Sequence, residues 1–337
     1  MNIILDGMGG DNAPLEIVKG AVEASELIKE KITIVGDEKL ILAELSKYNY
    51  DETKISVAHA EDVIENTDSP VKAIRTKKNS SMVVGMEMLR NGEGDLFISA
   101  GNSGALLAGS LFIIGRVQGI DRPALAMIYP IMGAQPSLLL DAGANAECKP
   151  ENLLEFATMG SIYLEKVLGR ENPSIGLVNV GAEETKGTTV CKAAYELLAK
   201  SKLNFIGNVE ARDIPFAASD VLVCDGFVGN VVLKLTEGMA LSLLTQVKKK
   251  FTEGLKAKVG AALLYDKMKV LKNEFDYSEY GGAPILGVKK PIVKMHGSSN
   301  ANAVKNSIIK GIFFAEKNVV QTIADSVLEL EEISISE

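Results

Sequence analysis

The sequence predicts an α/β protein in which a mostly parallel sheet lies between two layers of helices, a three-layer α/β/α fold. Two observations predict it. Short apolar runs alternate along the chain with longer segments of helical periodicity. Six of the apolar runs also pass through a loop of glycine and small polar residues before the next helical pattern begins. This alternation is typical of parallel strands whose two faces are both covered by helices.

Each expected strand is a short apolar run that ends at a turn signal. In chain order these runs are residues 3–5, 32–35, 55–58, 96–98, 124–129, 137–140, 175–178, 205–206, 221–224 and 291–295. Helical periodicity covers residues 14–30, 38–47, 71–90, 104–118, 150–168, 188–201 and 300–326. No repeat, low-complexity tract or Pro/Ser-rich linker divides the chain, so we expect residues 1–328 to form a single α/β unit, with one or two lobes.

Composition limits the class of protein. The 337 residues, 47% of them hydrophobic and 24% charged, are enough to bury a large core. The formal charge of -8 argues against broad attraction to nucleic acid, which depends mostly on Lys and Arg. Three widely spaced cysteines suggest no disulfide framework, and no secretion signal is evident. We expect a cytoplasmic protein whose residues 329–337 form an acidic, loosely ordered tail.

The segment 238–276 departs from the alternation and is expected to be a protruding pair of amphipathic helices. Its apolar residues recur every four positions from Met239 to Leu255. Its lysines include Lys248, Lys249, Lys250, Lys256 and Lys258. The apolar run 259–264, with Leu263 and Leu264, is expected to form the bend. Two interpretations stay open: the pair packs on the core or a second subunit, or its apolar end touches lipid while the lysines favour anionic headgroups.

The glycine loops are expected to gather at the carboxyl ends of the strands, where open α/β sheets bind ligands. They are residues 6–12, 99–104, 141–145, 179–187, 225–230 and 296–300. Glycine lets backbone N–H groups approach an anion closely, so the loops predict a phosphate-handling cleft. The first loop fails the dinucleotide fingerprint because Asn12 stands at the third glycine position. A Walker A motif is absent as well, and we assign neither a cofactor nor a metal site.

Two charged or titratable side chains are candidates for the cleft. Lys186 follows a strand, stands near Gly181 and Gly187 and leads into a helical segment. There a lysine and free backbone N–H groups can hold a phosphate together, although a solvated surface lysine is the alternative. His296 is a candidate either for the cleft or for a structural hydrogen bond.

Asparagines stand in or beside five of the loops, at Asn12, Asn102, Asn145, Asn179 and Asn230. Any single one fits a turn or a helix cap. Five at one edge of a sheet would supply amide donors that stabilise a developing oxyanion or orient a phosphate without carrying charge.

Together these motifs resemble those of PlsX, the family of bacterial phosphate acyltransferases. The matching segments are residues 6–14 (DGMGGDNAP), 99–105 (SAGNSGA), 141–145 (DAGAN), 179–187 (NVGAEETKG), 225–230 (DGFVGN), 281–288 (GGAPILGV) and 296–299 (HGSS). The resemblance implies a homodimer with a fold similar to phosphotransacetylases and isocitrate/isopropylmalate dehydrogenase-like enzymes. The implied reaction transfers a long-chain acyl group from acyl carrier protein (ACP) to inorganic phosphate. A membrane glycerol-3-phosphate acyltransferase would use the acyl phosphate to begin phospholipid synthesis.

The implied reaction fits the residues of the catalytic unit. Phosphate is already partly a dianion at neutral pH, and a thiolate leaving group needs little protonation, so the site must chiefly position its substrates and supply oxyanion donors. We expect Lys186 to clamp phosphate, Asn230 and Asn145 to donate from their amides, and His296 to assist. The other expected phosphate- or substrate-binding residues are Gly9, Gly10, Asn12, Gly101, Asn102, Ser103, Gly104, Asn179, Gly181, Asp225, Gly229 and Ser298, of which Asp225 chiefly holds its loop.

The resemblance also implies partners. ACP is strongly acidic, so we expect it to dock on the lysines around 248–272, which include Lys248, Lys249, Lys250, Lys256 and Lys258. We expect Leu263 and Leu264 to contact the anionic inner face of the cell membrane. A phosphotransacetylase that uses acyl-CoA would need the same loops, and the residues alone do not separate CoA from ACP. A decarboxylating dehydrogenase of similar fold, or a non-catalytic acyl or phosphate sensor, are further alternatives.

Overall fold

The computed structural model describes residues 1–131, 133–274 and 281–335. The strands are β1 (Asn2–Asp6), β2 (Lys31–Gly36), β3 (Ile55–His59), β4 (Leu96–Ser99), β5 (Ala124–Leu125), β6 (Met127–Tyr129), β7 (Ser137–Leu140), β8 (Ile175–Asn179), β9 (Phe205–Glu210), β10 (Val221–Val223), β11 (Ala283–Leu286) and β12 (Ile292–Lys294).

The α-helices are α1 (Leu15–Ser25), α2 (Glu38–Leu45), α3 (Pro70–Thr76), α4 (Ser81–Asn91), α5 (Ser103–Gly109), α6 (Pro150–Leu168), α7 (Thr189–Lys200), α8 (Gly226–Thr252), α9 (Leu255–Glu274), α10 (Ala301–Glu316) and α11 (Val319–Ile335). A π-helical segment (Ser110–Ile114) continues α5, and a 3-10 turn (Ile214–Phe216) follows β9.

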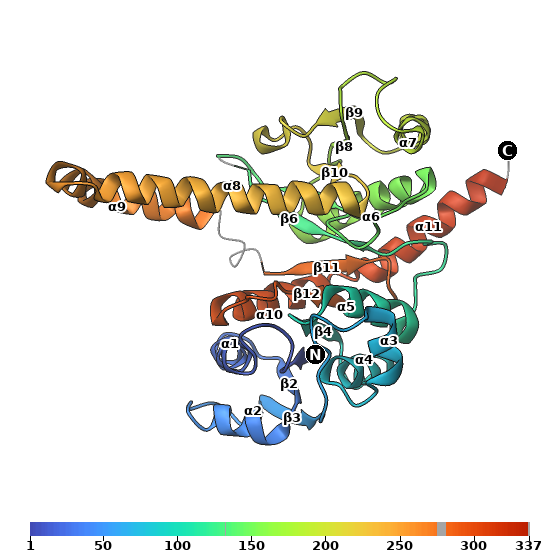
Figure 1. The fold of residues 1–337 in the computed structure, drawn as a ribbon. Helices are drawn as coiled ribbons and strands as arrows, with labels where there is room; N and C mark the ends of the chain where they lie inside the picture. The colour runs from blue at the N-terminus through green and yellow to red at the C-terminus, as the bar shows by residue number, and fades with distance from the viewer. Residues whose placement is uncertain (132, 275–280, 336–337) are drawn as a thin grey trace.

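The strands form two sheets, and each sheet is the centre of one lobe. The larger sheet has the order β3-β2-β1-β4-β12-β11-β5, and the smaller has the order β6-β7-β10-β8-β9. Neighbours are parallel except that β11 runs antiparallel to β12 and β5, and β6 runs antiparallel to β7. Figure 1 shows helices packed around both sheets. The predicted three-layer α/β/α class is confirmed, with the strands divided between two sheets.

β1 lies in the middle of the larger sheet because its side chains are apolar on both faces. Ile3, Ile4 and Leu5 are fully buried, as expected for a parallel strand covered on both sides. Ile3 pairs with Ile32 of β2 on one side and with Leu96 of β4 on the other. Burial of each such side chain stabilises the fold by about 1.5–3 kcal/mol.

One hydrophobic core joins the two lobes. It includes Leu5 and Ile98 from the larger sheet, Leu140 and Val223 from the smaller sheet, and Phe156 of α6. The lobes therefore share a continuous apolar interior, which fixes the loops of one lobe relative to those of the other.

Three elements expected from the sequence are divided in the structure. The strand expected at 124–129 becomes β5 in the larger sheet and β6 in the smaller, so the chain crosses between the lobes there. The helix expected at 71–90 is two helices because the Ser80 side chain accepts the backbone N–H of Val83 and begins α4. The helix expected at 300–326 divides at Asn318, whose φ of 54° is left-handed.

Two further differences concern the last third of the chain. β11 is a strand that the apolar pattern did not predict, because Pro284 argues against one. α11 continues to Ile335, so the loosely ordered tail expected at 329–337 is helical as far as residue 335. Residues 336–337 lie outside the described residues.

The part of α8 beyond Glu237 and the whole of α9 form an arm that projects from the body (Figure 1). α8 begins at Gly226 rather than near residue 238. The chain turns back at Glu253 and Gly254, whose φ is 87°. The bend expected at 259–264 is therefore wrong, because these residues lie within α9. Residues 275–276 of the expected pair lie outside the described residues.

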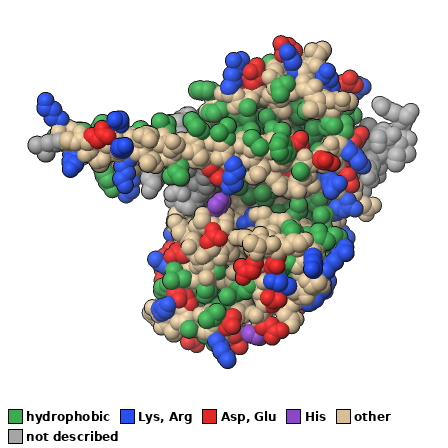
Figure 2. All heavy atoms as spheres, viewed as in Figure 1, with side chains coloured by type: hydrophobic (Ala, Val, Ile, Leu, Met, Phe, Trp, Pro, Cys, Tyr) green, Lys and Arg blue, Asp and Glu red, His purple; other side chains and the backbone are tan. Residues whose placement is uncertain are grey.

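Charged and apolar side chains are mixed on the surface of the arm, as Figure 2 shows. Lys248, Lys249, Lys250, Lys256 and Lys258 are all exposed near the turn. Leu263 is 82% exposed and Leu264 46% exposed, and both lie on α9 away from the turn. By length and composition alone α8 could cross a membrane, but its first turns line the cleft described next.

Candidate active site

A cleft of about 540 Å³ opens between the two lobes. Its polar lining includes Ser103, Asn230, Lys234, Glu237, Lys294 and His296. Its apolar wall comes from β5, β6 and α8 and includes Leu125, Met127 and Leu233. Ligand sites are commonly concave and mostly apolar with a few convergent polar groups. This cleft combines a cationic end with an apolar wall.

Lys234 and His296 meet across the cleft. Lys234 lies on α8, and its Nζ is 2.7 Å from Oε2 of Glu237. The same Nζ lies 3.4 Å from Nε2 of His296, which follows β12. Burial and then the charge of Lys234 lower the pKa of His296, so its imidazole is neutral at pH 7. A neutral imidazole adds hydrogen-bonding capacity here without adding charge.

A turn after β12 holds the ring of His296. Its Nδ1 lies 2.8 Å from Oγ of Ser298 and accepts the backbone N–H of the same residue at 3.2 Å. Asn12 donates its amide to the carbonyls of Ser298 and Ser299 at 3.2 and 3.3 Å. Asn12 therefore braces the last glycine loop against the first, and Nε2 of His296 is left facing Lys234.

Lys294 is a buried lysine at the end of β12. It is 8% exposed and lines the cleft. Burial lowers the pKa of Lys294 to about 8, while the carboxylates of Asp6 and Asp11 oppose that fall. Its Nζ donates to the carbonyl of Met295. No carboxylate in the described part of the chain lies within ion-pair distance of Nζ, so the charge of Lys294 is available to a bound anion.

Asp6 ties the first two glycine loops together. Its Oδ2 accepts the Ser99 hydroxyl at 2.6 Å, and its Oδ1 accepts the backbone N–H of Gly9 at 3.1 Å. The backbone N–H of Gly101 donates to Oγ of Ser99 at 3.0 Å. Burial raises the pKa of Asp6, and the hydrogen bond from Ser99 counteracts that rise. A Cβ on Gly9 would lie 2.5 Å from Oδ2 of Asp6, so Gly9 serves close packing, and Gly10 has the left-handed φ of 101°.

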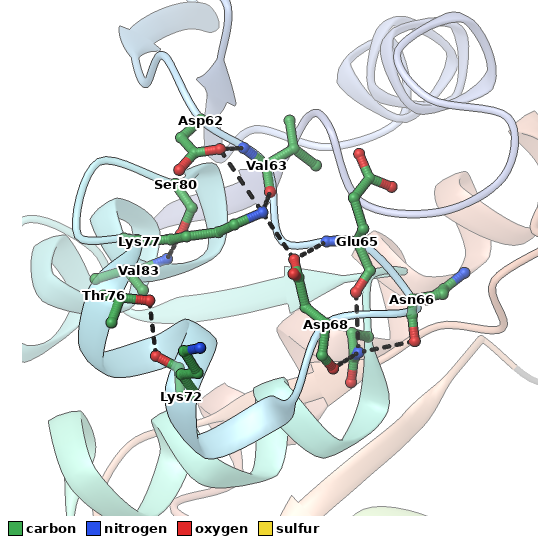
Figure 3. A network of polar contacts seen from close by, with 11 residues as sticks. Asp62, Val63, Glu65, Asn66, Asp68, Lys72, Thr76, Lys77, Ser80 and Val83 are labelled. Atoms are coloured by element: carbon green, nitrogen blue, oxygen red, sulfur yellow. Dashed lines mark hydrogen bonds and ion pairs between the residues drawn. The ribbon is translucent and has the colours of Figure 1, made fainter.

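Asn102 caps α5 rather than facing the cleft. Its Oδ1 accepts the backbone N–H of Ala105 at 3.0 Å, and its Nδ2 donates to the carbonyls of the 65–68 loop. Figure 3 shows this loop held by a network around Lys77. The next residue, Ser103, is exposed and lines the cleft. In the 99–104 loop, Ser103 is therefore the residue whose side chain can contact a ligand in the cleft.

Asp141 organises the loop after β7. Its carboxylate accepts the backbone N–H groups of Leu125 at 3.1 Å and of residues 143–145 at 2.7–3.1 Å. Asn145 donates both hydrogens of its amide within the protein, to Oδ2 of Asp141 at 2.9 Å and to the carbonyl of Pro123 at 2.8 Å. Asn145 is also buried. It therefore braces this loop and offers no amide donor to the cleft, contrary to the expected role.

α8 carries Asn230 to the rim of the cleft. Asp225 caps the helix, its Oδ1 accepting a backbone N–H of the first turn at 2.7 Å, so it holds its loop as expected. A Cβ on Gly229 would lie 1.9 Å from the carbonyl oxygen of Asp141, so only glycine permits this approach. Asn230 is exposed and lines the cleft. Within the described residues its side chain has no hydrogen-bond partner, so its amide can bind a ligand.

Lys186 lies outside the cleft. It is exposed, and its aliphatic stem packs on Gly181, where a Cβ would lie 2.9 Å from Cγ of Lys186. Asn179 shapes the same loop by donating to the carbonyl of Lys186 at 3.2 Å. β10 separates β8 from β7 in the smaller sheet, so the loop after β8 lies farther from the cleft than the loop after β7 does. The geometry does not support a phosphate clamp at Lys186 within this chain.

Comparison with known proteins places the chain in a family. A sequence model of the family described as "Fatty acid synthesis protein" matches residues 1–322. The chain belongs to this family. A phosphate acyltransferase of Clostridioides difficile (strain 630) is 51% identical over 323 residues, covering 96% of this chain and 95% of that protein. A phosphate acyltransferase of Alkaliphilus oremlandii (strain OhILAs) is 52% identical over 330 residues, 98% of each chain. The resemblance to phosphate acyltransferases is confirmed.

Solved structures of other proteins have a fold similar to that of this member of the fatty acid synthesis family. A phosphotransacetylase from Streptococcus pyogenes has a TM-score of 0.62 at 15% identity and covers 94% of both chains. A branched-chain phosphotransacylase from Enterococcus faecalis V583 has a TM-score of 0.57 at 15% identity, covering 94% of this chain and 99% of that one. At this identity the likeness concerns the fold alone, and it agrees with the expected phosphotransacetylase-like architecture.

Sequence reasoning missed three charged residues of the cleft in this family member: Lys234, Glu237 and Lys294. Lys234 stands one helical turn after Asn230, and Glu237 nearly one turn further, so the helical spacing of α8 could have identified them. Lys294 is a lysine within the apolar run that leads to His296. A charged side chain inside a buried strand usually has an ion-pair partner or a functional role.

Proposed function

We propose that this protein transfers a long-chain fatty acyl group from acyl-ACP to inorganic phosphate, giving acyl phosphate for the start of phospholipid synthesis. The names of its relatives support phosphate as the acceptor. The observation that carries the proposal is the cleft itself, where Lys234 and Lys294 face a shared space beside His296 and an apolar wall. A phosphate dianion and an acyl chain are the two groups that such a lining suits.

The cationic end supports phosphate binding. Lys294 and Lys234 supply charge, and the hydroxyls of Ser298 and Ser103, which line the same cleft, supply donors. Glu237 pairs with Lys234, which fixes the position of that ammonium group. A lysine can bind phosphate as a point charge.

The reaction needs positioning more than acid–base catalysis. An oxygen of the phosphate dianion attacks the thioester carbonyl carbon, the C–S bond breaks in the resulting tetrahedral intermediate, and the thiolate leaves and takes a proton from solvent. The thiol has an ordinary pKa near 8.5, so its thiolate is a good leaving group. The free amide of Asn230 stands on the rim as a donor for the oxyanion, and neutral His296 as a second donor. The apolar side chains of Leu233 and Met127, which line the cleft, hold the first carbons of the acyl chain.

The arm supports the choice of ACP as donor. Five exposed lysines, Lys248, Lys249, Lys250, Lys256 and Lys258, stand near its turn on a chain of formal charge -8. An acidic carrier would be steered to such a local basic surface. A CoA-dependent phosphotransacetylase would have less need for these lysines, and a sensor would bind the acyl group without consuming it.

The exposed leucines of α9 support a peripheral position on the inner face of the membrane. Leu263 is 82% exposed, and neighbouring lysines suit anionic headgroups. In this proposal the protein is a cytoplasmic homodimer, and a membrane glycerol-3-phosphate acyltransferase takes up its product.

One assay tests the proposed reaction. Purified protein is incubated with palmitoyl-ACP, with or without inorganic phosphate, and mass spectrometry follows palmitoyl phosphate and free ACP. We expect both products only when phosphate is present, and strongly reduced formation with Asn230→Ala. Parallel reactions with palmitoyl-CoA and acetyl-CoA distinguish the phosphotransacetylase alternative. Release of free palmitate independently of phosphate, or binding without cleavage, would contradict the proposal.

A further inference from the structure

Among the described residues that line the cleft, Glu237 alone is acidic. α8 places Asn230, Lys234 and Glu237 on one face of the helix, at spacings of four and then three residues, and all three line the cleft. Oε2 of Glu237 lies 2.7 Å from Nζ of Lys234. The Glu237 side chain is only 24% exposed. Its carboxylate therefore faces the cleft more than the solvent.

The carboxylate of Glu237 is close to the other charged groups of the cleft. Burial is the main cause of the lowered pKa of His296, and the charges of Lys234 and Lys294 lower it further. The negative charges of Glu237 and Asp11 oppose that fall. These groups come from α8, from β12 and from the first glycine loop, and all of them act on one imidazole. An anion held by Lys234 and Lys294 beside His296 therefore meets the carboxylate of Glu237 as well.

A carboxylate beside an anion site discriminates between anions. An ionised carboxylate only accepts hydrogen bonds, so it repels an oxyanion that carries no proton and binds the hydroxyl of one that does. At neutral pH the monoanion and the dianion of inorganic phosphate both have a P–OH group, whereas sulfate has no hydroxyl. Within the described residues no group donates a hydrogen bond to Oε1 of Glu237. This oxygen can therefore accept a P–OH group.

We propose that Glu237 accepts a hydrogen bond from the P–OH group of bound inorganic phosphate and thereby selects phosphate over sulfate. The inference rests on the proposed function, in which phosphate is the acyl acceptor. With its hydroxyl turned toward Glu237, phosphate presents its unprotonated oxygens to Lys234, Lys294 and the thioester. One of these oxygens attacks the carbonyl carbon, so no proton has to leave the phosphate during the attack.

The alternative is that Glu237 only holds Lys234 in place, as ion pairs at this spacing do on many helix surfaces. α8 provides a matched control for that role. At its far end Lys250 and Glu253 form another pair three residues apart, with Nζ 3.1 Å from Oε2. The Glu253 side chain is 49% exposed and lies outside the cleft. Glu237→Gln and Glu253→Gln each remove one negative charge from such a pair, but only Glu237→Gln removes it from the cleft.

Isothermal titration at pH 7 with inorganic phosphate, arsenate and sulfate tests the proposal. Arsenate also carries a hydroxyl group at this pH, so the native protein should bind it with an affinity similar to that for phosphate. Sulfate should bind more weakly by about tenfold or more, because a hydrogen bond to a charged group changes affinity by about 10- to 150-fold. In Glu237→Gln the ratio of the sulfate Kd to the phosphate Kd should fall by about tenfold, chiefly because sulfate binds more tightly. Glu253→Gln should keep the native ratio.

Three outcomes would overturn the inference. One is equal affinity of the native protein for phosphate and sulfate, a measurement that needs no variant and stays decisive if Glu237→Gln does not fold. Another is an equal fall of both Kd values in Glu237→Gln, which would leave only a general repulsion of anions. The third is an equal rise of both Kd values, which would make Glu237 no more than a support for Lys234.

Binding and turnover are measured separately, so the proposed function can fail without the role of Glu237. If the protein forms no palmitoyl phosphate while the anion ratios change as expected, the proposed reaction fails and the selection by Glu237 stands. If palmitoyl phosphate forms but sulfate competes with phosphate equally in the native protein and in Glu237→Gln, the reaction stands and the selection by Glu237 fails.

Discussion

Replacing Lys294 by methionine should weaken phosphate binding and remove most of its pH dependence. Lys294 lines the cleft, and burial lowers its pKa to about 8. Raising the pH from 7 to 9 crosses this value and leaves about a tenth of the Lys294 side chains protonated. Inorganic phosphate passes from a mixture of monoanion and dianion at pH 7 to the dianion at pH 9, equally for the native protein and for Lys294→Met, and the pKa of His296 lies below its ordinary value. We therefore expect the Kd of the native protein for phosphate to rise about tenfold relative to that of Lys294→Met.

Isothermal titration with inorganic phosphate at pH 7 and pH 9 measures this effect. In Lys294→Met the Kd should be at least tenfold higher at pH 7 and should change little by pH 9. Lys186→Ala is the control: it should keep the native pH dependence, because Lys186 is exposed and lies outside the cleft. Equal affinity of the native protein at both pH values, or native affinity in Lys294→Met, would refute the reasoning.

The same burial also affects stability. The folded pKa of Lys294, about 8, is lower than its ordinary value of 10.5. Between these pH values the unfolded chain binds more protons than the folded protein, so stability rises with pH through this window. The whole effect of Lys294 is about 3 kcal/mol. Urea unfolding between pH 8 and 10.5 should show this contribution in the native protein and not in Lys294→Met.

Three other variants test separate parts of the structure. Asp141→Asn should lower the free energy of unfolding by about 2–4 kcal/mol, because an amide NH2 would face several N–H donors; a loss below about 1 kcal/mol in urea unfolding would contradict the organising role of Asp141. Joint substitution of Lys248, Lys249 and Lys250 by glutamate should raise KM for palmitoyl-ACP at least fivefold and leave KM for phosphate unchanged, and an unchanged KM for palmitoyl-ACP would exclude this docking surface. Leu263→Glu should release the protein from vesicles of anionic lipid and preserve its turnover in solution, so undiminished co-sedimentation would reject the lipid contact.

The order of strands and helices could be predicted from the sequence because parallel strands are apolar on both faces. β1 is an example, since all of its central residues are buried. The division into two sheets could not be predicted, because it depends on how the chain passes from β5 to β6 within one apolar run. Helical periodicity also predicted one helix where the structure has α10 and α11, because a single left-handed residue such as Asn318 does not interrupt the apolar pattern.

The candidate site was predicted only in part for a similar reason. Glycine loops showed where a cleft would be, and Asn230, Ser103 and His296 do line it. Local sequence could not show that the amide of Asn145 is used up by Asp141 and Pro123, because these bonds depend on tertiary packing. Nor could it show how far the loop of Lys186 lies from the cleft, because the strand order of the smaller sheet sets that distance.

The continuity of α8 has a mechanical consequence. The helix runs unbroken for 27 residues, with Asn230 and Lys234 near one end and Lys248 near the other. A rise of 1.5 Å per residue puts Asn230 and Lys248 about 27 Å apart on one rigid rod. Gly229 seats the base of the rod directly on the Asp141 backbone. A force applied near Lys248 is therefore transmitted along α8 to its contact at Gly229, beside the candidate cleft.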